Sequence, residues 1–156
     1  MSLPNFMCIG AAKSATTSLY DILRQHSDVF APSFKEPHFF DTPSVYKNGV
    51  KWYSKTYFNN VKNEKRIGDF TPTYLFENEA PKRIFDNLGG EVKFIIILRN
   101  PVDRAYSHYL HSLRNEHESL SFEDALSNEQ TSKKEYLSYL RHSYSERLAY
   151  CEHGRA

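Results

Sequence analysis

Cysteine is scarce in this chain. Its 156 residues include only Cys8 and Cys151, and Cys8 falls in a short apolar segment that is typical of a buried strand. Proteins that depend on disulfides carry more cysteines at regular spacings. The sequence therefore argues against a structural disulfide and favours a reducing compartment, so we expect a cytoplasmic location.

Net charge and long apolar runs are also lacking. The formal net charge is +1, which gives no general attraction to nucleic acid or to an anionic membrane. The longest apolar run covers residues 94–98, whereas a membrane-spanning helix needs about 20 such residues. No secretory signal is visible. Neither nucleic acid nor a membrane is therefore an expected partner.

The chain does have enough apolar material for a core. Hydrophobic residues make up 40% and aromatic residues 15% of it, and its length fits one domain, residues 1–156. Apolar strand patterns alternate with helical ones, which predicts an α/β fold with a central parallel sheet. The strongest strand pattern covers residues 92–98 and predicts a central strand. A last amphipathic helix is predicted between residues 137 and 151.

Residues 6–23 predict a strand, a tight loop and a helix. The apolar run 6–9 is too short for a helix, Gly10 ends it, and Leu19, Ile22 and Leu23 have the spacing of one helix face. The loop between them carries a lysine and four hydroxyl side chains: Lys13, Ser14, Thr16, Thr17 and Ser18. Loop N–H groups and a helix N-terminus attract phosphate-like anions. An ordinary turn with a solvated lysine remains the alternative from these residues alone.

The loop does not match the nucleotide-triphosphate pattern G-x-x-x-x-G-K-[ST]. Counted from Gly10, Ala15 stands at the second glycine and Thr16 at the lysine. The order Lys13-Ser14-Ala15-Thr16-Thr17 instead resembles K-[ST]-G-T-[TS], the 5′-phosphosulfate loop of sulfotransferases that use PAPS (3′-phosphoadenosine 5′-phosphosulfate). Ala15 replaces the usual glycine. The resemblance implies that residues 13–18 bind PAPS and its product PAP, with Lys13 also stabilising the leaving group.

Residues 35–41, Lys-Glu-Pro-His-Phe-Phe-Asp, set polar side chains among aromatic ones. Taken alone, they suit a loop pinned by its two phenylalanines. They closely resemble the K-E-P-H-F-F-D segment of heparan sulfate 3-O-sulfotransferases and related bacterial enzymes. The resemblance implies that Glu36 is the general base, with His38 and Asp41 near the acceptor. His38 remains an alternative base.

Two further segments resemble the same enzymes. Residues 49–53 match their G-x-x-W-Y stretch, although composition alone makes Trp52 a core residue. Residues 71–74, Thr-Pro-Thr-Tyr, resemble T-P-S-Y, with Phe70 at a position where those enzymes often have a lysine.

Residues 98–107 resemble the 3′-phosphate motif R-[ND]-P-x-[DE]-R-x-x-S. The resemblance assigns Arg99 and Ser107 as phosphate ligands, and the planar arginine fork suits that task. Asn100 and Pro101 predict the start of a helix, whose apolar face would contain Tyr106, Tyr109, Leu110 and Leu113. His108 and His111 lack a zinc-type ligand pattern, so no metal is expected.

The predicted function is transfer of a sulfuryl group from PAPS to a hydroxyl or amine, on a P-loop-like parallel sheet of a truncated sulfotransferase fold. The expected acceptor is a small molecule or a saccharide. The alternatives are a nucleoside or small-molecule kinase, or a non-catalytic module that binds PAP or PAPS. Members of the family usually continue for about another hundred residues beyond this point, which leads us to expect self-association through an open sheet edge or the last helix.

Overall fold

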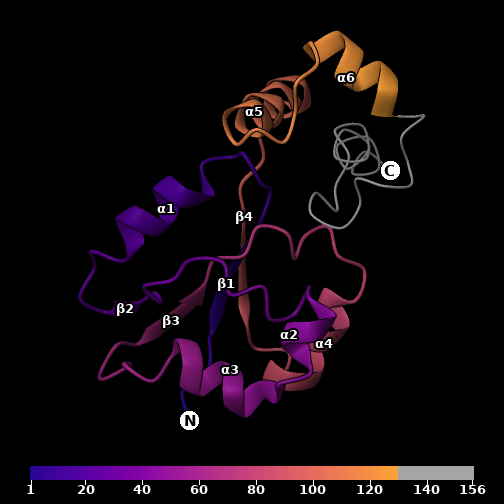
Figure 1. The fold of residues 1–156 in the computed structure, drawn as a ribbon. Helices are drawn as coiled ribbons and strands as arrows, with labels where there is room; N and C mark the ends of the chain where they lie inside the picture. The colour runs from indigo at the N-terminus through magenta and orange to yellow at the C-terminus, as the bar shows by residue number, and fades with distance from the viewer. Residues whose placement is uncertain (130–156) are drawn as a thin grey trace. The chain divides into compact units, whose positions relative to one another are not determined.

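The computed structural model describes residues 1–129 in two compact units, Met1–Leu98 and a second that begins at Arg99. The elements of the first unit are β1 (Phe6–Gly10), α1 (Thr16–Leu23), β2 (Val29–Phe30), α2 (Pro43–Tyr46), α3 (Gly49–Tyr57), β3 (Arg66–Asp69), α4 (Ala80–Leu88) and β4 (Lys93–Ile96) (Figure 1). The second unit contains α5 (Pro101–Arg114) and α6 (Phe122–Glu129). The helix predicted between residues 137 and 151 lies outside the described residues, and the assignment of one domain stays a prediction.

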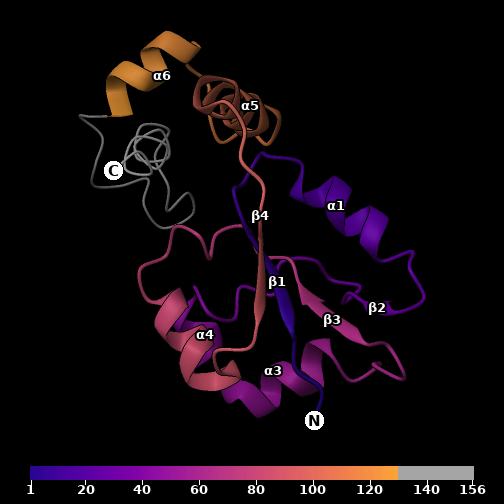
Figure 2. The same cartoon turned by 180° about the vertical axis from the view of Figure 1, so that it is seen from behind.

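The sheet of the first unit is parallel throughout. Its strand order is β2-β3-β1-β4, so β1 lies between β3 and β4 (Figure 2). Met7 of β1 is opposite Asp69 of β3 on one side and Phe94 of β4 on the other. The predicted α/β fold with a parallel sheet flanked by helices is confirmed.

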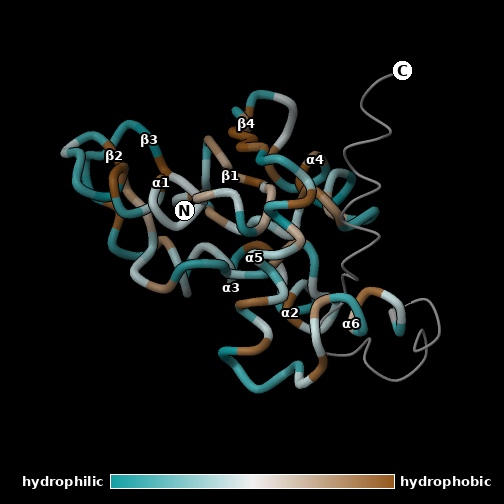
Figure 3. Tube along the Cα trace, turned by 90° about the horizontal axis from the view of Figure 1, so that it is seen from above, coloured by the Kyte–Doolittle hydropathy of each residue, from teal (hydrophilic) through white to brown (hydrophobic). Residues whose placement is uncertain are grey.

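The predicted central position of the strand in residues 92–98 is wrong within the described part of the chain. There β4 lies at the edge of the sheet, and Phe94 and Ile96 are 52% and 49% exposed. The segment is nonetheless strongly hydrophobic, as its brown colour in Figure 3 shows. An apolar run indicates that a segment forms a hydrophobic strand, but the connections between the strands determine the strand order in the sheet. The two interior strands are β3 and β1, and in β1 Met7 and Cys8 are completely buried.

An apolar cluster covers each face of the sheet. The smaller one joins β1 and Phe70 to Tyr20 of α1. The larger one is mainly aromatic and unites the sheet with α3 and α4: Met7, Phe39, Phe40, Tyr53, Phe58, Tyr74, Ala80, Ile84 and Val92. Within it, the ring of Phe39 stacks on Tyr53 with the ring centroids 4.3 Å apart. The two phenylalanines of residues 35–41 thus anchor that segment in the core.

Two side chains predicted to pack inward lie at the surface. Ile22 is 65% exposed, because α1 turns the side that carries Tyr20 towards the core. The Tyr20 hydroxyl donates a hydrogen bond to the carbonyl oxygen of Pro32 (2.8 Å). Trp52 is 36% exposed on α3, while the neighbouring Tyr53 is completely buried. The spacing of apolar residues locates the buried face of a helix only to within about one residue. A short helix also buries only a narrow stripe of side chains, so a neighbouring apolar residue can lie at the surface.

The second unit confirms the predicted helix start. The Asn100 side chain accepts hydrogen bonds from the backbone N–H groups of Val102 (3.0 Å) and Asp103 (3.4 Å). The predicted apolar face is half wrong, because Tyr106 and Leu110 are each 47% exposed. Tyr109 is buried with Ala125 of α6. Ser121 caps α6 by accepting a hydrogen bond from the Asp124 N–H group (3.1 Å).

We predict that Ala15→Gly stabilises the protein. Ala15 precedes α1 with φ +65°, a left-handed conformation that costs an alanine about 1–2 kcal/mol and a glycine far less. Part of that gain is lost through the greater freedom of glycine in the unfolded chain. Urea unfolding should therefore show an increase of about 1 kcal/mol in the free energy of unfolding.

Ala12→Gly is the matched control for this experiment. Ala12 lies in the same loop, but it is not among the residues with positive φ. Glycine should therefore leave stability unchanged or reduce it there, by about 0.5–1 kcal/mol at most. Equal destabilisation by both substitutions would contradict the argument from backbone strain at Ala15.

Candidate functional site

The loop after β1 has the backbone of an anion site. Lys13 and Ala15 both have φ +65°, with Ser14 between them and α1 starting at Thr16. Left-handed residues alternating in this way turn successive N–H groups towards one point, which forms an anion-binding nest. The amino-terminal end of α1 adds its partial positive charge there. This loop contains residues 13–18 of the sequence-based donor assignment, which stays a prediction.

Ser14 provides an independent indication of a ligand. Its side chain is 3% exposed, and among the residues that the structure describes its hydroxyl oxygen has no hydrogen-bond partner. A buried hydroxyl without a partner costs about 1–3 kcal/mol, so an anionic oxygen placed in the loop would supply what is missing. Thr16 is also buried, Lys13 is half-buried, and Thr17 and Ser18 are exposed. This polar, cationic donor set fits a phosphosulfate group.

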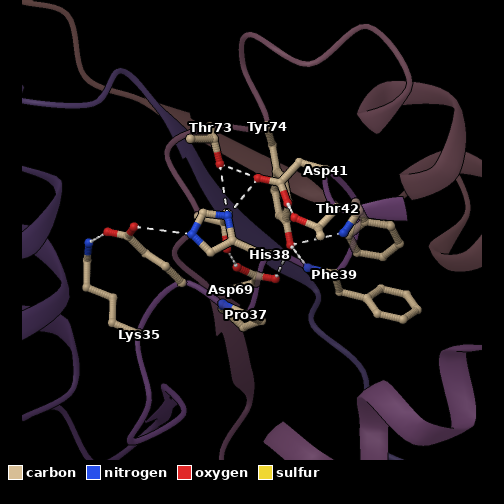
Figure 4. Close-up of polar contacts among 12 residues, drawn as sticks. Lys35, Pro37, His38, Phe39, Asp41, Thr42, Asp69, Thr73 and Tyr74 are labelled. Atoms are coloured by element: carbon tan, nitrogen blue, oxygen red, sulfur yellow. Dashed lines mark hydrogen bonds and ion pairs between the residues drawn. The ribbon is translucent and has the colours of Figure 1, made fainter. Parts of the chain in front are cut away.

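Residues 35–41 form a chain of alternating charges (Figure 4). Lys35 Nζ contacts Glu36 Oε1. On the other side of the same carboxylate, Glu36 Oε2 lies 3.7 Å from His38 Nε2. The second ring nitrogen, His38 Nδ1, lies 2.8 Å from Asp41 Oδ2. The imidazole is therefore held between two carboxylates.

This arrangement fixes the charge of each group. Hydrogen bonds to Asp41 and Glu36 raise the pKa of His38 to about 10. Burial alone would raise the pKa of Glu36, but contacts with His38 and Lys35 outweigh it and lower that pKa below its ordinary value. The pKa of Asp41 is lowered in the same way by His38 and Thr73. At neutral pH the segment thus holds an imidazolium between two ionised carboxylates.

The turn after β3 supports this segment. Thr73 donates a hydrogen bond to Asp41 Oδ2, and the Tyr74 hydroxyl accepts from the backbone N–H of Phe39 (3.1 Å). Sequence comparison with T-P-S-Y marked residues 71–74 without revealing this supporting role. Lys35 was likewise present in the motif but unassigned. The sequence signal that could have indicated this role is Asp69 at the end of a predicted strand, followed closely by Thr71 and Thr73.

The remaining assigned residues lie in the second unit. Arg99 is exposed and precedes the helix cap Asn100, while Ser107 is half-buried on α5. Within residues 1–129, no group of three or more histidine, cysteine, aspartate or glutamate side chains is arranged to hold a metal ion. The expectation of a site without metal stays a prediction.

Comparison with known proteins connects this geometry to a family. Residues 3–152 match the family model of the sulfotransferase domain. The chain belongs to the sulfotransferase family. A crystal structure of a sulfotransferase from Alicyclobacillus acidocaldarius has 32% sequence identity and a TM-score of 0.86, and the match covers 99% of this chain and 68% of that one.

Two sulfotransferases illustrate the sequence similarity. The membrane-associated sulfotransferase kil1 of Dictyostelium discoideum is 38% identical over 116 residues, 73% of this chain and 24% of that protein. Heparan sulfate glucosamine 3-O-sulfotransferase 3B1 of Mus musculus is 37% identical over 121 residues, 78% of this chain and 30% of that protein. The chain thus spans less than a third of the length of either sulfotransferase.

We predict that His38→Gln destabilises the protein most at mildly acidic pH. The pKa of His38 is raised from 6.5 to about 10 in the folded state, so its favourable contribution is complete below about pH 6.5 and disappears as the pH rises towards about 10. The difference in unfolding free energy between wild type and variant should therefore be larger near pH 6 than near about pH 9.5. Urea unfolding at both pH values measures it.

His26→Gln serves as the control for His38→Gln. His26 is exposed and accepts a hydrogen bond from the backbone N–H of Asp28 (3.1 Å), outside the charged segment. Its substitution should change stability little. A destabilisation by His38→Gln that does not depend on pH would contradict the imidazolium between carboxylates.

Proposed function

We propose that this chain binds PAPS and transfers its sulfuryl group to a hydroxyl or amine of an acceptor. The observation that carries the proposal is a nest in which the buried Ser14 hydroxyl has no partner among residues 1–129, in the same unit as Glu36, whose carboxylate is held ionised. Membership of the sulfotransferase family supports it.

PAPS would supply the reactive sulfuryl group and leave as PAP. Lys13 and the N–H groups of the loop would hold the charge that builds on the leaving phosphate oxygen. Ser14, Thr16, Thr17 and Ser18 would bind the 5′ end and fix its orientation. Arg99 and Ser107 are the proposed ligands of the 3′-phosphate, as the motif resemblance implies.

Glu36 is the proposed general base. A base must have a free lone pair at the working pH, and the lowered pKa of Glu36 keeps its carboxylate ionised. His38, with a pKa of about 10, carries a proton on each ring nitrogen at neutral pH and so has no lone pair to offer. We therefore assign proton transfer to Glu36, and to His38 the task of holding that carboxylate.

A saccharide or small molecule is the proposed acceptor. Among the similar proteins are several named as heparan sulfate glucosamine 3-O-sulfotransferases, which favours a sugar hydroxyl or amine. No helix in residues 1–129 is long and apolar enough to cross a membrane. Self-association through the sheet edge or the last helix, and a cytoplasmic location, stay predictions.

Calorimetric titration distinguishes this proposal from a kinase. The loop has Thr16 at the position where a nucleotide-triphosphate site needs a lysine. PAP should bind to the chain, whereas ATP with Mg²⁺ should bind weakly or not at all. Binding of PAP without sulfuryl transfer to any tested acceptor would instead indicate a binding module.

We predict that Lys13→Ala weakens PAP binding. Loss of a hydrogen bond to a charged group costs about 1.5–3 kcal/mol, so the dissociation constant should rise by about 10- to 150-fold. Isothermal titration calorimetry measures this directly. Lys51→Ala is the control, because Lys51 is an exposed lysine on α3. Equal PAP affinity in the Lys13 and Lys51 variants would remove Lys13 from the site.

A second prediction concerns Glu36→Gln. The amide keeps the shape of the side chain but cannot accept the acceptor proton, so the transfer rate should fall by roughly a hundredfold or more. PAP affinity should stay within about twofold of wild type, because the base acts on the acceptor. A wild-type rate in this variant would remove Glu36 as the base, and a large loss of PAP binding would make it a structural residue.

A further inference from the structure

Asp69 is a buried carboxylate that the proposed reaction does not use. It ends β3, is completely buried, and accepts three hydrogen bonds from hydroxyl groups. The donors are Tyr53 to Oδ2 (2.5 Å), Thr71 to Oδ1 (2.6 Å) and Tyr74 to Oδ2 (3.1 Å). Such a concentration of polar groups in an aromatic core is costly unless every group is satisfied, so its arrangement calls for an explanation.

The Tyr74 hydroxyl connects Asp69 to the candidate base. A hydroxyl has one hydrogen to donate and two lone pairs that accept. Because the hydrogen points to Asp69, both lone pairs remain for the backbone N–H groups of Phe39 (3.1 Å) and Phe40 (3.4 Å). The carboxylate therefore fixes the orientation in which Tyr74 can hold both amides (Figure 4).

The segment held in this way has an unfavourable backbone. Glu36 and His38 have φ values of +64° and +52°, a left-handed conformation that is uncommon for residues other than glycine. Such a conformation persists only where the surroundings enforce it. The two amides anchored by Tyr74 follow directly after His38 and fix the chain where it enters the core.

We infer that Tyr74, oriented by Asp69, is a positioning residue for Glu36, an assignment that rests on the proposed sulfuryl transfer. The hydroxyl of Tyr74 holds the backbone of residues 36–40 so that the Glu36 carboxylate stays where the acceptor proton can reach it. Thr73 fixes the same segment from its other side through Asp41. Neither Tyr74 nor Asp69 touches the reacting groups.

The test compares Tyr74→Phe with Tyr53→Phe in the whole chain. Both substitutions remove one fully buried hydroxyl that donates to Asp69 and keep the ring. Only Tyr74 also accepts from the amides of Phe39 and Phe40. The Tyr53 variant therefore measures the effect of removing one hydrogen bond to Asp69 while the contacts of Tyr74 with the Phe39 and Phe40 amides are kept.

Three readouts are measured on both variants: PAP affinity, the maximal transfer rate, and hydrogen exchange of the Phe39 and Phe40 amides by NMR. Tyr74→Phe should lower the maximal rate by about 10- to 100-fold, since a displacement of about 1 Å can have that effect. Exchange at the two amides should accelerate, while PAP affinity stays unchanged. Tyr53→Phe should leave the rate and this exchange near wild type.

The exchange measurement separates this inference from the proposed function. If wild type shows no transfer, the proposed function fails, while faster exchange in Tyr74→Phe alone still supports the anchoring role. Equal exchange and equal rates in the two variants would overturn the inference. If Tyr74→Phe does not fold, Asp69→Asn replaces it; a smaller loss with the same pattern supports the inference, and a wild-type rate overturns it.

Discussion

The charge state of the site depends on one imidazolium between two carboxylates. An isolated charge that is half removed from water is costly, so each of these groups is stable as an ion only because its neighbours are ions of opposite sign. His38 lowers the pKa of both Glu36 and Asp41, and they in turn raise its own. The carboxylate of Glu36 is consequently available at neutral pH, and its direction is set by a side chain that cannot itself take up a proton.

The support for this arrangement comes from distant parts of the chain. The turn after β3 contacts residues 35–41 through Thr73 and Tyr74. Tyr20 of α1 donates a hydrogen bond to the carbonyl oxygen of Pro32, shortly before this segment begins. The helix that carries Tyr20 begins at the anion loop. One short helix therefore links the loop that would hold the donor to the segment that would supply the base.

The sequence predicted the parts of this protein better than their connections. The order of strands and helices followed from local apolar spacing, and Glu36, His38 and the loop at Lys13 followed from motifs. The edge position of β4 was missed because it depends on the path of the chain between strands. The buried network around Asp69 was missed because hydrogen bonds between residues such as Tyr53 and Asp69 leave no periodic pattern. Ile22 and Trp52 were misplaced because which side of a short helix is covered depends on its neighbours.

The pairing of β1 with β4 has a consequence for how the chain folds. Phe6 pairs with Lys93, so the two strands come from opposite ends of the first unit, and this contact forms only after a long loop has closed. Until then residues 92–98 are an apolar, β-branched segment with a single charge and no strand to pair with. Segments of this composition associate with one another. We therefore expect closure of the β1–β4 pair to compete with association between chains that have not yet folded.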